Sequence, residues 1–277
     1  MKAVVIHAAK DLRIESCACE PVSADQVRVK IEAGGICGSD LHYFHDGGFG
    51  AVRLREPMIL GHEISGIIAE TGEDVAGLAV GDRVAISPSR PCHSCSYCER
   101  EIYNHCVNMR FYGSAMPMPH IQGAFREELV AEASQCHVVS PEVPAELAAF
   151  AEPLSVALHA LNRAGDITGK RVLITGCGPI GALTLLAAKS RGAALIVVTD
   201  VIDHVLDIAR TAGADRAINV AEHRDWITDF HTDDTGFDVM IEASGNQQAL
   251  RSGLEVLRRR SVLVQVGLGG DASLPLN

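Results

Sequence analysis

The sequence has no long hydrophobic run, since none of its apolar stretches reaches the roughly 18 residues of a membrane-spanning helix. Basic residues are also scarce, because 24 Lys and Arg stand against 35 Asp and Glu, for a net charge of −11. Such a surface repels phosphate backbones, so neither a membrane nor a nucleic acid is expected as a partner. The first residues, Met1–Val5, lack the apolar stretch and cleavage site of a signal peptide, and we expect a cytoplasmic protein.

The two halves of the chain differ in their sequence patterns. Within residues 1–150, short β-branched runs such as 26–31 and 128–131 are separated by Gly, Pro and Asp, which predicts a mainly-β domain with long loops. Within residues 151–277, apolar runs alternate with helical patterns, which predicts a parallel, doubly wound α/β sheet. The expected strands of this sheet are 171–175, 195–199, 217–220, 237–241 and 261–266, and the expected helices of this half and its approach are 145–161, 179–191, 202–212 and 247–257.

The number of strands predicted in the second half is low. Five are expected, whereas a complete dinucleotide-binding fold usually has about six. The chain ends at Asn277 soon after Leu274–Leu276, which leaves nothing to supply another strand. We therefore expect a missing C-terminal segment, with a naturally five-stranded domain as the alternative. The basic run Arg258–Arg260 is expected to be a solvated turn before the last strand.

A glycine-rich loop between an expected strand and an expected helix fits the pattern G-x-G-x-x-G. The first glycine permits a tight turn, the second lets the backbone approach a pyrophosphate, and the third lets helix and strand pack closely. An acidic residue then ends the next strand, where it can accept hydrogen bonds from ribose hydroxyls and repel a 2′-phosphate. NAD is therefore expected rather than NADP, with an unliganded turn as the alternative. The predicted cofactor-binding residues are Gly176, Gly178, Pro179, Ile180, Gly181 and Asp200.

Four of the nine cysteines crowd into one polar loop. In a reducing compartment, metal binding is favoured over disulfides. Four thiolates at this spacing can close a tetrahedron around Zn²⁺ with no position left for water, which is typical of a structural site. Four free thiols are the alternative. The clustered residues are Cys92, Cys95, Cys98 and Cys106, and four of the other cysteines, Cys17, Cys19, Cys136 and Cys177, are expected to be small buried residues.

Three further segments carry a weaker pattern. Cys37 lies in Gly-Ile-Cys-Gly-Ser-Asp-Leu-His, His62 and Glu63 follow a glycine, and Glu152 precedes a proline. A thiolate, an imidazole and a carboxylate that converge on one zinc can leave a coordination position open, as a catalytic site requires. Spacing alone does not establish this, and a buried cysteine and an ordinary histidine are the alternative.

Taken together, these motifs resemble the zinc-dependent medium-chain dehydrogenases, and within them the polyol branch of sorbitol, xylitol and L-idonate 5-dehydrogenases. The stretches 34–47, 89–113 and 176–181 are most similar to the L-idonate enzymes. The resemblance implies a GroES-like catalytic domain followed by a Rossmann domain. It also implies NAD-dependent oxidation of a polyol or sugar acid, with L-idonate to 5-ketogluconate preferred over oxidation of sorbitol, xylitol or galactitol. A protein that binds zinc and NAD without turnover is the alternative from another class.

The resemblance further assigns metal ligands. It implies that Cys37, His62 and Glu63 hold a catalytic zinc, with Glu152 reaching the metal directly or through its water. It also implies that the four clustered cysteines hold the structural zinc. For the full-length protein it implies a homodimer or a homotetramer.

Other residues are expected to serve the reaction. Ser39 can accept the proton of the alcohol, and His42 can pass it to solvent, because a neutral imidazole suits that step. Asp40 is expected to fix the tautomer of a ligand histidine, with capping of a turn as the alternative. Gly267 and Gly269 are expected to let the backbone lie against the nicotinamide.

Overall fold

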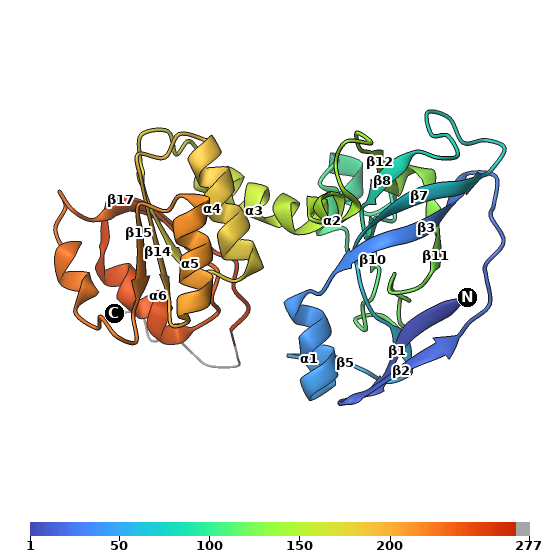
Figure 1. The fold of residues 1–277 in the computed structure, drawn as a ribbon, viewed down its shortest axis with the longest axis horizontal. Helices are drawn as coiled ribbons and strands as arrows, with labels where there is room; N and C mark the ends of the chain where they lie inside the picture. The colour runs from blue at the N-terminus through green and yellow to red at the C-terminus, as the bar shows by residue number, and fades with distance from the viewer. Residues whose placement is uncertain (270–277) are drawn as a thin grey trace. The chain divides into compact units, whose positions relative to one another are not determined.

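A computed structural model describes residues 1–269 of the chain. The chain forms two compact units, Met1–Glu152 and Pro153–Asn277 (Figure 1). None of the helices within residues 1–269 combines the length and the apolar character needed to cross a membrane. The segment Leu274–Leu276, on which the expectation about the C-terminus rests, lies outside the described residues.

The first unit is built on antiparallel strands. Its five-stranded sheet contains, in spatial order, β11 (Glu128–Glu132), β3 (Gln26–Gly35), β7 (Glu63–Thr71), β8 (Arg83–Ile86) and β12 (Cys136–Val138). Its three-stranded sheet contains β2 (Asp11–Ser16), β1 (Lys2–Ala8) and β6 (Met58–Ile59), and its two short ribbons are β4 (Gly48–Phe49) with β5 (Val52–Arg53) and β9 (Ser89–Arg90) with β10 (Arg110–Phe111). Short 3₁₀ turns cover Cys98–Arg100, Tyr103–His105 and Ala133–Gln135.

The period-two pattern of β3 builds the core of this unit. Val27 and Val29 are fully buried and alternate with more exposed residues. They pack against Ile64 and Ile68 of β7 and Leu129 of β11 in one apolar cluster. The predicted mainly-β domain is therefore confirmed, because alternate residues of each strand face one shared core.

The first unit also contains a helix that the β-branched runs did not predict. Helix α1 covers Gly38–Asp46 and follows Cys37 as its N-cap. Asp40 accepts a hydrogen bond from the Cys37 amide, and Gly47 ends the helix in a left-handed conformation at φ 68°. The cap and the terminal glycine are local signals that the mainly-β interpretation overlooked.

The second unit is a parallel sheet with helices on both faces, as predicted. Its strands are, in spatial order, β15 (Arg216–Asn219), β14 (Leu195–Asp200), β13 (Arg171–Thr175), β16 (Phe237–Glu242) and β17 (Leu257–Gln265). Its longer helices are α3 (Ala151–Ala164), α4 (Pro179–Ser190), α5 (Asp203–Ala212) and α6 (Gln247–Glu255), and a 3₁₀ turn covers Trp226–Asp229. Alternate residues of β13 face opposite layers: Val172 packs with residues of α3, α4 and α5, whereas Leu173 packs with the side chains around Trp226. In Figure 1, α4 and α5 lie side by side along one face of this sheet.

Two expectations about these elements are wrong. The expected helix 145–161 is two helices, because α2 (Ala145–Ala149) ends before Phe150 and α3 begins at Ala151. Pro153 explains the break, since its ring clashes with the carbonyl four residues earlier and it has no amide proton to donate. The run Arg258–Arg260 is also not a turn but part of β17. Arg258 pairs there with Asp238 at 3.0 Å.

The cysteines outside the loop are buried less uniformly than expected. Cys136 and Cys177 are buried, Cys17 is half-buried and Cys19 is exposed. The prediction of small buried residues is therefore wrong for Cys19. The segment around Cys19 lies between β2 and β3, and its exposed thiol lies 4.0 Å from Oε2 of Glu128.

Candidate active site

Cys37, His62 and Glu63 converge in the first unit, although the first is far from the other two in sequence. Their ligand atoms all lie within 4.8 Å of one another. Antiparallel pairing of β3 with β7 places Gly35 opposite Glu63, and Cys37 follows two residues later. The strand register therefore brings the thiol to the imidazole and the carboxylate.

Two glycines make room for this group. A Cβ atom on Gly35 would lie 2.2 Å from Oε2 of Glu63. Gly61, directly before His62, has φ +92°, and a Cβ there would lie 2.2 Å from Cδ1 of Phe125. Gly61 therefore requires glycine both for space beside the Phe125 ring and for its positive φ, whereas a Cβ on Gly35 would displace the end of the Glu63 side chain. Sequence reasoning overlooked both, although each glycine was visible beside a candidate ligand.

Asp40 links the two segments that carry the ligands. Its side chain is 3% exposed and accepts hydrogen bonds from the amides of Cys37 at 3.0 Å and Gly61 at 3.2 Å. Burial raises the pKa of Asp40, and the nearby His62 opposes that rise. Asp40 therefore caps the start of α1, which was the alternative role expected for it, and these hydrogen bonds go to backbone amides rather than to the imidazole of His62.

The donor set fits a zinc ion. Within the described part of the chain, Nδ1 of His62 is buried and has no hydrogen-bond partner. Burial raises the pKa of the Cys37 thiol, and burial likewise raises the pKa of the Glu63 carboxyl. A nearby dication favours the ionised form of such groups, and thiolate, imidazole and carboxylate are its usual protein ligands.

Glu152 lies near the candidate metal ligands but is not one of the three residues whose ligand atoms converge. Burial raises the pKa of Glu152, the charge of His62 lowers it and that of Glu63 raises it further. Among the residues that the structure describes, the set of ligand atoms within 4.8 Å contains Cys37, His62 and Glu63 but not Glu152. A direct metal bond from Glu152 stays a prediction.

Ser39 and His42 lie on the helix that Cys37 begins. Hydrogen bonds from Ser39 reach the Cys37 thiol and oppose the rise of its pKa. The side chain of His42 is 47% exposed, and its Nδ1 lies 3.8 Å from the carboxylate of Asp46. Ser39 therefore lies beside a candidate ligand, and His42 reaches solvent. Their roles as a proton relay stay a prediction.

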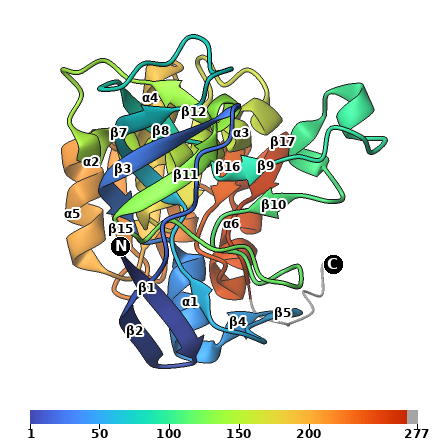
Figure 2. The same ribbon diagram turned by 90° about the vertical axis from the view of Figure 1, so that its right-hand side faces the viewer.

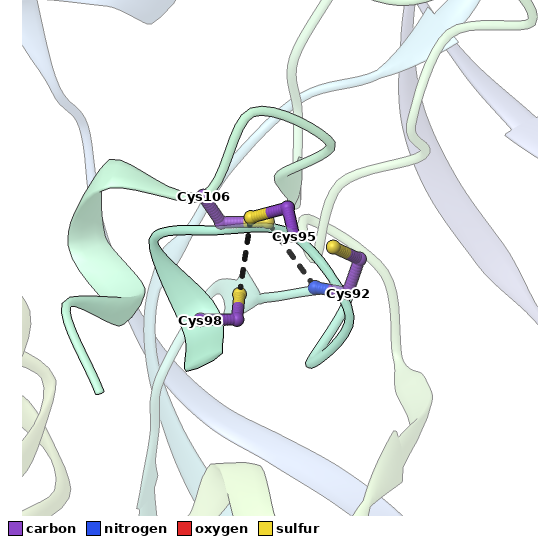
Figure 3. A group of neighbouring side chains, drawn as sticks. All are labelled: Cys92, Cys95, Cys98 and Cys106. Carbon is purple, nitrogen blue, oxygen red and sulfur yellow. Dashed lines mark hydrogen bonds between the residues drawn. The ribbon is translucent and has the colours of Figure 1, made fainter. Parts of the chain in front are cut away.

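The four clustered cysteines also meet in space. Figure 3 shows their side chains turned toward one another, and all four sulfur atoms lie within 4.8 Å. Sγ of Cys95 is 3.5 Å from Sγ of Cys98, and the Cys92 amide lies 3.2 Å from Sγ of Cys106. Their loop joins β9 to β10 and stands out from the rest of the first unit in Figure 2.

The thiols of this loop differ strongly in acidity. Hydrogen bonds from Ser94 lower the pKa of Cys92 to about 5. Burial, together with neighbouring thiols, raises the pKa of Cys98 to about 12. Four thiolates so close together require a cation, and four sulfur ligands complete a tetrahedral zinc shell without water. The cluster fits a structural zinc.

The glycine-rich loop of the second unit forms an open cradle at the start of α4. Gly176 has φ +87°, and a Cβ there would lie 2.7 Å from the Ser244 amide nitrogen. A Cβ on Gly181 would lie 2.0 Å from the carbonyl oxygen of Gly176, so helix and strand pack closely. Gly178 is the N-cap of α4, and a Cβ there would meet nothing within 4 Å. An open helix N-terminus of this kind attracts phosphate groups.

Asp200 ends β14 beside this cradle. One carboxylate oxygen accepts a hydrogen bond from the Cys177 amide at 2.7 Å. The other accepts from the amides of Val201 at 2.7 Å and Ile202 at 3.1 Å. The carboxylate is therefore fixed at the end of the strand that follows the glycine-rich loop, while its contact with a ribose stays a prediction.

Gly267 and Gly269 pack against the loop that follows β16. A Cβ on Gly267 would lie 2.2 Å from the Gly245 amide nitrogen, and a Cβ on Gly269 would lie 3.0 Å from the Gly245 carbonyl oxygen. These glycines therefore permit a close approach of two backbone segments. Their expected contact with nicotinamide stays a prediction.

Two family profiles match the chain. The profile described as alcohol dehydrogenase GroES-like domain matches residues 23–141, and the profile described as zinc-binding dehydrogenase matches residues 179–277. The chain belongs to the zinc-dependent medium-chain dehydrogenases. The predicted fold class is thereby confirmed together with the family.

Relatives of this dehydrogenase act on polyols and sugar acids, according to their names. L-idonate 5-dehydrogenase (NAD(P)(+)) of Escherichia coli is 44% identical over 242 residues, which cover 87% of this chain and 69% of the relative. Sorbitol dehydrogenase of Bacillus subtilis is 38% identical over 279 residues, which cover 100% of this chain and 78% of the relative. The crystal structure of L-idonate 5-dehydrogenase from Escherichia coli superimposes with a TM-score of 0.91 at 40% identity, covering 98% of this chain and 77% of that one. The chain is therefore a dehydrogenase of the polyol type.

Proposed function

We propose that this dehydrogenase oxidises a secondary alcohol of a sugar acid with NAD, and that L-idonate, which gives 5-ketogluconate, is its substrate. The observation that carries the proposed chemistry is the convergence of the Cys37, His62 and Glu63 ligand atoms within 4.8 Å. The substrate assignment is supported by the 44% identity to L-idonate 5-dehydrogenase. Sorbitol is the second candidate, because the 38% identity to a sorbitol dehydrogenase extends over the whole chain.

Cys37, His62 and Glu63 would hold the catalytic zinc, with Glu152 beside them. When bound, the ion supplies a Lewis acid that makes an alcohol hydroxyl more acidic. The net reaction removes a hydride from the carbinol carbon, which NAD accepts, and a proton from the hydroxyl. We assign Ser39 as the first acceptor of that proton, because its hydroxyl lies beside the Cys37 thiol. His42, which is half-exposed on the same helix, releases it to solvent.

The second unit would bind the dinucleotide. The open N-terminus of α4 at Gly178 would take the pyrophosphate, with Pro179 and Ile180 in the first turn. Asp200 would accept hydrogen bonds from the ribose hydroxyls and would repel a 2′-phosphate, so NAD is preferred over NADP. Gly267 and Gly269 would bring the backbone against the nicotinamide.

The proposed function is tested by the formation of NADH on purified, zinc-loaded protein. L-idonate, sorbitol, xylitol and galactitol are compared with NAD and with NADP. We expect the highest kcat/KM with L-idonate and NAD, and loss of turnover after removal of metal with a chelator. A higher kcat/KM with sorbitol would reassign the substrate, and absence of NADH with every substrate would favour a protein that binds its cofactors without turnover.

A further inference from the structure

A buried carboxyl group ends the strand next to the glycine-rich loop. Glu242 is the last residue of β16 and is 0% exposed. Among residues 1–269, no Lys, Arg or His forms an ion pair with it. Burying an acidic group without a cation is costly unless hydrogen bonds replace its water. The proposed reaction gives this group no role.

Hydrogen bonds to Glu242 come from three adjacent strands or the loops that follow them. Oε1 accepts from the amides of Ser244 at 2.8 Å and Gly245 at 3.0 Å, and also from the hydroxyl of Ser244. Thr175, the last residue of β13, donates its hydroxyl at 3.4 Å. Gln265, the last residue of β17, donates its amide to Oε2. One side chain thus joins the carboxyl ends of β13, β16 and β17.

The backbone around Glu242 is packed as closely as glycine permits. A Cβ on Gly176 would lie 2.7 Å from the Ser244 amide nitrogen, so the loop after β16 supports the first turn of the dinucleotide cradle. A Cβ on Gly267 would lie 2.2 Å from the Gly245 amide nitrogen and 2.7 Å from Oε2 of Glu242. In open α/β sheets, dinucleotides bind beyond this carboxyl edge of the strands. A small movement of the loop after β16 would therefore alter the binding surface.

We propose that Glu242 is a positioning residue for the dinucleotide, an inference that rests on the proposed function. Its carboxyl group draws the Ser244 and Gly245 amides inward and thereby fixes the loop against Gly176. Through Gln265 it also fixes the end of β17 and the backbone at Gly267. The cofactor then binds at a sheet edge that is already ordered. Its binding free energy is therefore not reduced by the cost of ordering three loops.

The variant Glu242→Gln tests this role. Glutamine has the same shape, but one carboxylate oxygen becomes an NH₂ group that faces the donors of Gly245 or Gln265. We expect the Kd for NADH, measured by fluorescence titration, to rise at least about ten-fold, since small misplacements of a binding surface are costly. Amide hydrogen exchange at Ser244 and Gly245 should accelerate. The zinc content should stay that of the unmodified protein, and KM for NAD should rise while KM for the alcohol stays unchanged.

Asp238→Asn is the matched control, because Asp238 lies near the amino end of the same strand. It accepts hydrogen bonds from the Arg171 amide at 2.8 Å and from Arg258 at 3.0 Å. This variant should lower the unfolding temperature without changing the Kd for NADH. If Glu242→Gln fails to fold, Gln265→Ala takes its place, since it removes one partner of Glu242 from an exposed position and should raise the Kd several-fold.

The outcomes separate this inference from the proposed function. If the unmodified protein binds no NADH, the proposed function and the role of Glu242 are both wrong. If it binds NADH and Glu242→Gln (or Gln265→Ala, where that variant replaces it) binds it equally well, only the role of Glu242 is wrong. If Asp238→Asn weakens NADH binding to the same degree, the effect reflects general stability of the sheet, and the positioning role is rejected.

Discussion

Gly61→Ala tests how the backbone before His62 builds the candidate metal site. Gly61 has φ +92°, its amide donates to Asp40 at 3.2 Å, and an added Cβ would lie 2.2 to 2.5 Å from three ring carbons of Phe125. The ring cannot move freely, because Phe125 packs against the cluster that includes Met58. The substitution therefore forces a shift of Gly61, and His62 shifts with it.

The expected loss of stability has two parts. A side chain in the left-handed region costs roughly 1 to 2 kcal/mol. An overpacked contact in a closely packed core costs about 1 to 3 kcal/mol more. The sum, about 2 to 5 kcal/mol, is a large share of the roughly 5 to 15 kcal/mol that holds a typical domain together.

Gly81→Ala is the control for this experiment. Gly81 has a similar φ of +96°, but a Cβ there would meet nothing within 4 Å. Gly81→Ala should therefore lower the free energy of unfolding only by the conformational part, about 1 to 2 kcal/mol. The measurements are chemical denaturation and zinc per chain, and the two clusters of ligands predict two ions in the unmodified protein. We expect Gly61→Ala to keep one ion and Gly81→Ala to keep both.

Equal stability of the two alanine variants would refute the contact with Phe125. Retention of both zinc ions by Gly61→Ala would refute the claim that this glycine sets the position of His62. The double variant Gly61→Ala with Phe125→Ala provides a further check, because removing the ring should restore zinc binding in part.

Four further substitutions, one of them a control, have expected outcomes. Gly35→Ala places a Cβ 2.2 Å from Oε2 of Glu63, so the affinity for the catalytic zinc should fall about 10-fold or more, as measured by competition with a chelator. Cys98→Ser should remove the structural zinc and lower the unfolding temperature by several degrees, whereas Cys136→Ser, at a buried cysteine outside the cluster, should keep both ions. Asp200→Ser should raise KM for NAD about ten-fold and narrow the preference over NADP, because it removes a charged acceptor at the ribose.

Each of these expectations has an outcome that contradicts it. Unchanged zinc affinity in Gly35→Ala would mean that Glu63 moves without loss and is not a ligand. A Cys98→Ser protein with two tightly bound ions would exclude a structural zinc at the loop. A preference for NADP in the unmodified protein would show that Asp200 does not select NAD.

The features predicted best from the sequence are those contained in one contiguous segment. Strand β13 has the bounds expected for it, Arg171–Thr175, and the glycine-rich loop lies directly after it. An apolar strand, a turn with three glycines and a helix start constrain one another locally. The pairing order of the sheet, with β13 between β14 and β16, depends on tertiary packing and was not predicted.

The metal site depends on the sheet register, which spacing does not reveal. Cys37 meets His62 and Glu63 only because Gly35 pairs with Glu63 across β3 and β7. The spacing of these residues did not decide whether they form a metal site, and the ligand assignment came from the family resemblance. The cap that Asp40 forms at Cys37 was one of the two roles left open by the sequence, but its second partner, Gly61, is close in space and distant in sequence.

Two other errors concern local patterns, one overridden by a tertiary contact and the other by a proline. The basic run Arg258–Arg260 was expected to be a solvated turn. Arg258 instead lies in β17, where it pairs with Asp238 on the adjacent strand. The Ala- and Leu-rich stretch 145–161 read as one helix, although Pro153 already marked the break. The ion pair of Arg258 is not visible in the sequence pattern, whereas the proline is.

Anomalous diffraction at the zinc edge, on crystals of the active protein, tests the central claim most directly. We predict one peak among the four clustered sulfur atoms and a second peak bonded to Cys37, His62 and Glu63, with a zinc–sulfur distance of about 2.3 Å. A fully active protein with no metal peak at Cys37, His62 and Glu63 would contradict the proposed chemistry.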